Sequence, residues 1–181
     1  MRLFIAVNFS PETRKKLLAF RDGLRALAES GRFTAPENLH LTLVFLGNCD
    51  MKQTNAAKRS LNALNFEPFT ITVAGGGHLD KGRANLVFCE LQNDDGRSKL
   101  SQLHRELSTS LSAKGFEIRQ RKFWPHITIG REVVWKDTDG SSVNWGIDFP
   151  GIEESVTSIE LMKSERINGK LTYTAIHKVK P

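Results

Sequence analysis

A four-residue pattern occurs twice in this chain, and it constrains the fold more than any other feature. The first copy reads HLTL and begins at His40, and the second reads HITI and begins at His126. Apolar and β-branched neighbours surround both copies, which favours extended strands. On a strand, residues i and i+2 lie on the same face. Each copy therefore predicts a strand with a histidine and a threonine on one face and two aliphatic anchors on the other.

The segments between the two copies predict further strands and helices. The sequence Ser10-Pro11-Glu12 is typical of a helix start, and apolar spacing extends this helix to about Glu29, with Gly31 just past its end. A turn region is expected at residues 75–77, which are three glycines, and a hairpin turn at Asn168-Gly169. Two more helices are expected at residues 50–64 and 94–114, and strands at residues 2–9, 39–46, 69–73, 84–91, 116–118, 125–129, 156–163 and 171–179. This mixture predicts an α+β fold.

Length and composition favour one globular domain, or one domain of two lobes, that covers residues 1–181, and two motif strands that each follow a long helix favour the two lobes. No apolar run is long enough to cross a bilayer, and the apolar stretch at the N-terminus is too short for a signal peptide, so we expect a cytoplasmic protein. Cys49 and Cys89 are too few for a disulfide scaffold and are expected to be reduced. The formal net charge of +6 mildly favours an anionic partner such as a phosphate ester or nucleic acid.

Two histidines that face one cleft indicate general acid–base chemistry. An imidazole has an ordinary pKa near 6.5, so one ring can accept a proton while the other donates one. The hydroxyls of Thr42 and Thr128 are suited to donate hydrogen bonds to phosphoryl oxygens, where negative charge builds up in the transition state. Arg131 would add a cation. In a regular strand its side chain would lie on the opposite face from Thr128, so a bulge at Gly130 or the long reach of arginine would have to bring it into the site.

The two motifs and their flanks resemble those of a known family. Residues 38–47 read NLHLTLVFLG and residues 123–131 read FWPHITIGR, and the chain opens with RLFIAV. In all three stretches the sequence is similar to the two-histidine phosphoesterases, and more narrowly to the LigT-like RNA 2′,3′-cyclic phosphodiesterases, also called 2′-5′ RNA ligases. The resemblance covers the whole chain in length and in motif placement.

This resemblance implies a bilobal α+β fold with an antiparallel sheet and flanking helices in each lobe, and an active site in the central groove. It also implies metal-independent hydrolysis of a 2′,3′-cyclic phosphate at an RNA end to a 2′-phosphate, with no cofactor. His126 would act as the proton acceptor that activates water, and His40 as the proton donor to the departing 3′ oxygen. These two roles exchange if the attacking side is reversed.

The resemblance further implies a set of substrate contacts. Thr42 and Thr128 would hold the phosphate with help from Arg131, and Phe45 and Phe123 would shape the groove or stack on a base. For both phenylalanines a core role is an equal alternative. The family often carries an aromatic residue after the mid-chain glycines, where this chain instead reads GHLD. Residues 136–150 are expected to form a loop with no assigned role. The protein is expected to be a monomer.

Several alternatives to this function remain open from the sequence. The same basic groove could belong to a non-catalytic RNA-binding protein, although binding alone requires no acid–base pair. The same site could also act on other nucleotides with 2′,3′-cyclic phosphate ends, on 2′-5′ linkages, or in the reverse direction as a ligase. A zinc hydrolase is disfavoured because the motifs place no third metal ligand.

Overall fold

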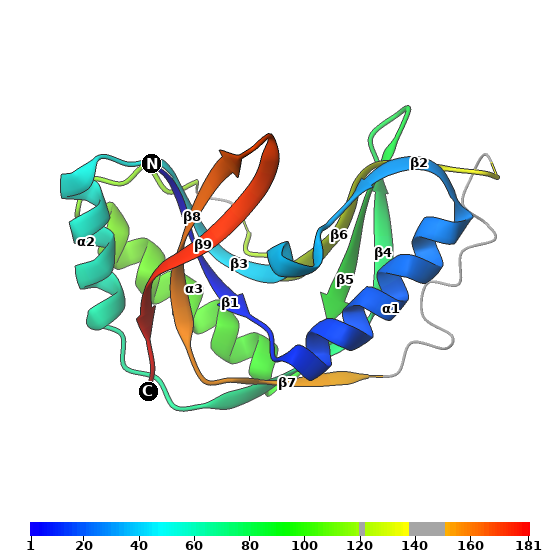
Figure 1. Cartoon of the computed structure of the whole chain (residues 1–181). Coiled ribbons are helices and arrows are strands. Elements are labelled where there is room, and N and C mark those ends of the chain that lie inside the picture. Colours follow the sequence, from blue (N-terminus) through cyan, green and yellow to red (C-terminus); the bar gives the residue numbers. More distant parts are fainter. Residues whose placement is uncertain (120–121, 138–150) are drawn as a thin grey trace.

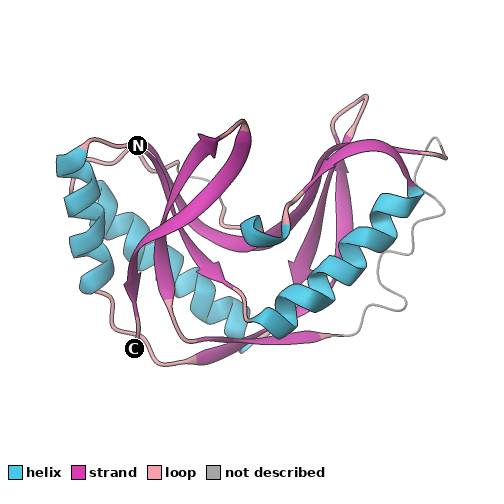
Figure 2. Ribbon diagram, in the orientation of Figure 1, coloured by secondary structure: helices cyan, strands magenta, loops and turns pink. Residues whose placement is uncertain are grey.

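In the part of the chain that the structure describes, nine strands form one curved, antiparallel sheet that three helices and a short 3₁₀ helix flank (Figures 1 and 2). The structure is a computed structural model that describes residues 1–119, 122–137 and 151–181. The strand order is β7-β4-β5-β6-β3-β1-β8-β9, and β2 pairs with the far end of β6. The elements are β1 (Arg2–Asn8), α1 (Pro11–Leu27), β2 (Ala28–Phe33), η1 (Pro36–Asn38), β3 (His40–Asn48), α2 (Met51–Asn62), β4 (Phe69–Asp80), β5 (Asn85–Leu91), α3 (Asp95–Ser112), β6 (His126–Trp135), β7 (Ile152–Val156), β8 (Ile159–Ile167) and β9 (Lys170–Val179).

The sheet consists of two halves that meet in its middle. One half contains β3, β1, β8 and β9, and the other contains β6, β5, β4 and β7 together with β2. The two halves are joined where β3 and β6 pair antiparallel, with Leu41 opposite Ile127. Each half begins at a motif strand, so the expected α+β architecture of two related lobes is confirmed. In Figure 1, α2 lies at one end of the molecule and α1 covers the other half.

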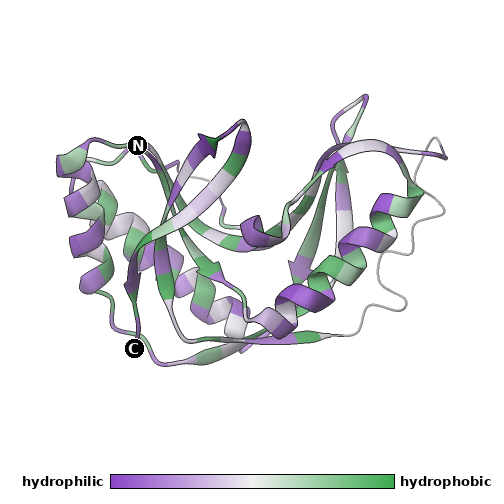
Figure 3. Ribbon diagram, in the orientation of Figure 1, coloured by the Kyte–Doolittle hydropathy of each residue, from purple (hydrophilic) through white to green (hydrophobic). Residues whose placement is uncertain are grey.

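A single large apolar cluster fills the space between the sheet and its helices. Leu41 and Ile127 are fully buried in it, together with Leu17 of α1 and Leu107 of α3. In Figure 3, α1 and α2 both carry hydrophilic and hydrophobic residues in alternation along their length, as amphipathic surface helices do. A second, smaller cluster contains Phe4, Ala6 and Met162, with Tyr173 packed against it. It lies on the opposite face of β1 from Leu3, Ile5 and Val7.

The first helix ends earlier than its apolar spacing predicted. It begins as expected, with the Ser10 side chain accepting a hydrogen bond from the Thr13 N–H, but it stops at Leu27. Residues 28–33 then form β2, so the helix ends two residues before the expected end at Glu29, and Gly31 lies inside a strand. The four central residues of this edge strand are exposed, which leaves no alternation of apolar and polar residues for a sequence analysis to detect.

The glycine turn expected at residues 75–77 is also wrong, because these residues continue β4. A β-carbon on Gly76 would lie 2.5 Å from the Phe20 ring of α1, and one on Gly77 would lie 2.9 Å from the Phe88 ring. The glycines therefore permit close packing on both faces of a strand rather than a change of direction. A register shift between Val73 and Gly75 does place a bulge here.

Four other expectations for the chain remain to be compared with the structure. Residues 116–118 form no strand, and the strand expected at 156–163 is divided into β7 and β8 by a break at 157–158. The hairpin turn at Asn168-Gly169 is confirmed, with φ values of 50° and 78° that suit a tight turn between β8 and β9. Most of the loop expected at 136–150 lies outside the described residues.

Candidate active site

The two motif strands bring their histidines and threonines onto one face in the middle of the sheet. We call this the site face: the face of β3 and β6 that carries His40, Thr42, His126 and Thr128. Because Leu41 pairs with Ile127 in antiparallel register, His40 lies across from Thr128 and Thr42 lies across from His126. The four side chains are partly exposed, whereas their aliphatic neighbours are fully buried. The faces predicted from the alternation are therefore the observed ones.

Both imidazoles are held in the same way. His40 Nδ1 donates a hydrogen bond of 2.7 Å to the backbone carbonyl of Asn38, and His126 Nδ1 donates one of 2.8 Å to that of Trp124. A carbonyl can only accept, so in each neutral ring the proton is on Nδ1 and the lone pair is on Nε2. His40 Nε2 lies 3.0 Å from the hydroxyl oxygen of Thr42, which is the donor in this state. The Nε2 atoms are thus the ones available for proton transfer.

The pKa values of both histidines are lowered from the ordinary value near 6.5. Burial, which disfavours the charged ring, is the largest cause for His40 and for His126. The hydrogen bond to the carbonyl acts in the opposite direction, and the positive charge of Arg131 lowers both pKa values further. His126 and Arg14 also lower the pKa of His40. Free of substrate, both rings are therefore mainly neutral at pH 7.

A bulge follows the threonine in each motif strand and returns a side chain to the site face. On β6, Thr128 pairs with Phe88 and Gly130 pairs with Val87, so two residues of β6 advance against one of β5. Ile129 and Gly130 are consequently both buried, and Arg131 is exposed beyond them. This bulge is one of the two routes by which Arg131 was predicted to approach the histidines.

The bulge on β3 has the same position relative to its motif. Thr42 pairs with Ala6 and Val44 pairs with Ile5, so Leu43 and Val44 are both buried. Phe45 then lies on the site face opposite Phe4, with 66% of its surface exposed and the two rings 6.3 Å apart. Phe45 and Arg131 thus hold equivalent positions, three residues after the threonine of each motif.

Phe123, the other aromatic residue expected to shape the groove, is packed differently. Its ring stacks on His104 of α3 with a centroid distance of 4.3 Å and an interplanar angle of 7°, and it packs against the large apolar cluster. His104 Nδ1 in turn donates to the backbone carbonyl of Leu43 in β3. The pair supports the motif strand from the helix side, as the core alternative for Phe123 requires.

Aromatic residues that the sequence did not single out lie against both histidines. The Trp124 ring stacks on His126 at 4.4 Å, and Phe88 contacts Trp124 edge-on at 4.6 Å. Phe4 lies 4.9 Å from the His40 ring, and Tyr173 of β9 contacts the same ring edge-on at 5.2 Å. Trp124 stands next to a motif and could have been suspected for that reason, but nothing in the sequence connects Tyr173 with His40.

The buried Asn38 connects β9 to the first motif. Its side-chain amide donates to the carbonyl of Leu171, and its side-chain oxygen accepts from the N–H of Tyr173. Its own backbone carbonyl holds His40. One residue therefore fixes both the His40 tautomer and the strand that carries Tyr173.

The described residues offer no group of three or more His, Cys, Asp or Glu side chains that could hold a metal ion. None of the helices in this part of the chain has the length and apolar character of a membrane span.

Comparisons with known proteins agree with this architecture. Residues 9–168 match the model of a family described as the 2′-5′ RNA ligase superfamily. A curated relative from Thermotoga maritima, named RNA 2′,3′-cyclic phosphodiesterase, is 33% identical over 167 residues, which span 91% of this chain and 87% of the relative. Escherichia coli LigT in apo form is similar in structure, with a TM-score of 0.81 and 26% identity over 99% of this chain and 96% of that chain. Escherichia coli LigT complexed with 3′-AMP covers the same shares with a TM-score of 0.78 and 26% identity.

The resemblance expected from the two motifs is thereby confirmed, as is the LigT-like fold. The family match extends from just after β1 through the hairpin turn at Asn168, and it includes both motif strands. This chain belongs to the 2′-5′ RNA ligase superfamily.

Proposed function

We propose that this chain is a metal-independent RNA 2′,3′-cyclic phosphodiesterase that converts 2′,3′-cyclic phosphate ends to 2′-phosphates. One observation carries the proposal: the Leu41–Ile127 pairing puts two imidazoles with available Nε2 atoms and two hydroxyls on one exposed face. A neutral imidazole can remove a proton from water, and a protonated one can supply a proton to a leaving oxygen. The name of the Thermotoga maritima relative supports the same reaction.

The proposed reaction needs one proton acceptor and one proton donor. His126 Nε2 takes a proton from water as the water oxygen attacks phosphorus, and the bond from phosphorus to the 3′ oxygen breaks. His40 Nε2 gives its proton to that 3′ oxygen, which leaves a 2′-phosphate. Thr42, Thr128 and Arg131 stabilise the negative charge on the phosphoryl oxygens. A bound phosphate also raises the pKa of a nearby imidazole, which favours the protonated state that His40 needs.

The aromatic residues on the site face suit a nucleoside as the rest of the substrate. Phe45 is the most exposed of them and stands three residues after Thr42, so its ring can stack on the base of the terminal nucleotide. Binding of 3′-AMP by Escherichia coli LigT is consistent with a nucleotide at this face. We assign no substrate contact to Phe123, because its ring is stacked on His104. We also propose that the enzyme acts as a monomer in the cytoplasm, and size-exclusion chromatography with light scattering tests the first part.

Hydrolysis of an RNA oligonucleotide with a 2′,3′-cyclic phosphate end tests the proposed function. In EDTA the protein should open the ring at an unchanged rate, and phosphorus NMR should show a 2′-phosphate. Replacement of His40 or His126 by alanine should each lower kcat/KM by about 10²–10⁴-fold while the fold is kept. An unreacted ring, a 3′-phosphate product or loss of activity in EDTA would each refute the proposal.

The same variants separate the acid from the base. A p-nitrophenyl phosphodiester has a leaving group that needs no protonation, so His40→Ala should lose much less activity on it than on the cyclic phosphate. His126→Ala should lose activity on both, because water still has to be deprotonated. The opposite pattern would exchange the two roles.

A further inference from the structure

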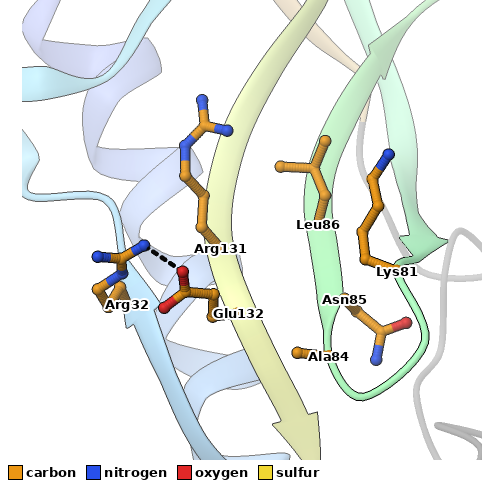
Figure 4. Close-up of a pocket in the computed structure, with 7 residues that line it drawn as sticks. All are labelled: Arg32, Lys81, Ala84, Asn85, Leu86, Arg131 and Glu132. Atoms are coloured by element: carbon orange, nitrogen blue, oxygen red, sulfur yellow. Dashed lines mark hydrogen bonds and ion pairs between the residues drawn. The ribbon is translucent and has the colours of Figure 1, made fainter.

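A pocket of about 320 Å³ lies beside the proposed catalytic residues and shares one residue with them. It is formed by β2, β6 and the β4–β5 hairpin, and Figure 4 shows its residues. Arg131 of β6 and Leu86 of β5 flank the same space, with Lys81 beyond Leu86 on the hairpin (Figure 4). The residues that line the pocket are Arg32, Lys81, Ala84, Asn85, Leu86, Arg131 and Glu132.

The strand register makes this pocket a continuation of the site face. Phe88 pairs with Thr128, so these two residues share a face of the sheet. Leu86 is two residues from Phe88 on the same strand and lies on that face as well. Leu86 therefore lies about 7 Å along β5 from Phe88, the residue that pairs with Thr128. Arg131 belongs both to the pocket and to the surroundings of the histidines, because it lines the pocket and its charge lowers the pKa values of His40 and His126.

Positive charge dominates the rim of the pocket. Arg32 and Glu132 pair with each other at 2.5 Å, so their charges largely cancel. Lys81 and Arg131 take part in none of the ion pairs found among the described residues, and both are exposed. Two free cations on one pocket favour an anionic ligand such as a phosphate.

Ala84 and Leu86 give the pocket an apolar part, and Leu79 lies beside it without lining it. Leu86 is partly exposed, and its cross-strand neighbour Leu79 on β4 has 41% of its surface exposed. The Asn85 side chain is already hydrogen-bonded within the protein, to His78 and to the backbone carbonyl of Val133, so we assign it no contact with the ligand. An aliphatic surface next to two cations matches a nucleotide, which has a flat base and an attached phosphate.

The backbone of β6 holds the rim in an unusual conformation. Glu132 has a φ of 54°, a left-handed conformation that a residue with a β-carbon adopts at a cost. Glu132 lies at a second register shift between β5 and β6. Gly130 pairs with Val87 and Val133 pairs with Asn85, so three steps along β6 match two steps along β5. This shift lets the consecutive residues Arg131 and Glu132 both reach the pocket, and Glu132 binds Arg32 there.

From this geometry we infer that the pocket is a second nucleotide subsite, which binds the nucleotide preceding the cyclic-phosphate end. The base lies on Leu86 and extends over its exposed neighbour Leu79 beside the pocket, and the phosphate that joins the two nucleotides lies between Lys81 and Arg131. The inference rests on the proposed function and adds to it a preference for RNA ends over mononucleotides. Lys81 contacts only the longer substrate, whereas Arg131 contacts both.

The test compares two substrates, 2′,3′-cyclic AMP and a tetranucleotide RNA with a 2′,3′-cyclic phosphate end. Wild-type protein should have the higher kcat/KM on the tetranucleotide. Lys81→Ala should lower the ratio of the two kcat/KM values about three- to fivefold, as expected for one exposed phosphate contact, and Lys81→Glu should lower it further. Lys52→Ala, on the distant helix α2, removes the same charge and should leave the ratio unchanged.

Tetranucleotide binding at several salt concentrations gives an independent measure. Lys81→Ala should reduce the slope of log K against log salt by about 0.7, the value for one lost contact to a single strand. An unchanged ratio and slope in Lys81→Ala, or an equal change in Lys52→Ala, would overturn the subsite. If neither substrate is hydrolysed, the proposed function fails, and the salt slope with the product-like 2′-phosphate tetranucleotide still decides whether the pocket binds RNA.

Discussion

At the scale of single residues, the two histidines share the same three influences. Each donates a hydrogen bond from Nδ1–H to a carbonyl two residues earlier in the chain, each is partly buried, and each is close enough to Arg131 for that charge to lower its pKa. Since one acceptor and one donor are required, kcat/KM should depend on pH as a bell whose limbs reflect the two rings. Both pKa values are lowered, so the maximum should lie below about pH 6.5.

Replacement of Arg131 should move this maximum. In Arg131→Gln the protonated rings no longer face the guanidinium, so both pKa values rise and the bell shifts to higher pH. The activity at the maximum should also fall, because a phosphate ligand is lost. Arg131→Lys keeps the charge and should keep the position of the maximum while binding phosphate less well. A bell that stays in place in Arg131→Gln would mean that Arg131 does not act on the imidazoles.

At the scale of elements, one close backbone contact positions helix α3 against the sheet. Gly96 lies in the first turn of α3, where a β-carbon would be 2.0 Å from the backbone oxygen of Thr70 in β4. Helix α3 also contacts β3, through the hydrogen bond from His104 to the Leu43 carbonyl. The packing of this helix therefore depends on a residue without a side chain.

Two glycine substitutions test this dependence by chemical denaturation. Gly96→Ala should lower the free energy of unfolding by about 1–3 kcal/mol, because the strand or the helix has to move. Gly23→Ala makes the same change at an exposed site of α1, where the added β-carbon meets nothing within 4 Å beyond its own turn of helix, and it should raise the free energy of unfolding by about 0.5–1 kcal/mol. Equal effects of the two substitutions would contradict the packing argument.

Elements were predictable from the sequence where burial repeats with a regular period. The motif strands alternate, and the leucines of α3 follow the helical period, so both were expected at nearly their observed places. Strand β2 is exposed along its centre and has no such signal. The glycines at 75–77 led to the wrong prediction of a turn. Their role is to leave room for the rings of Phe20 and Phe88, which lie far away in the sequence. Contacts of this kind appear only after the chain has folded.

At the scale of the whole molecule, the site exists because the two halves of the sheet meet at one pair of residues. His40 and His126 are 86 positions apart in sequence, and the pairing of Leu41 with Ile127 places their strands side by side. The paired motifs predicted that the four polar side chains would come together. They did not predict Tyr173 at His40, because β9 reaches that ring through the Asn38 side chain.

The central claim is that the two histidines act as one unit, and a double-variant cycle measures this most directly. We expect His40→Ala and His126→Ala each to lower kcat/KM on the cyclic-phosphate oligonucleotide by about 10²–10⁴-fold. The double variant should lose much less than the product of the two single losses, as groups that act together in one step do. Losses that multiply in the double variant, or a single variant with full activity, would contradict the two-histidine mechanism.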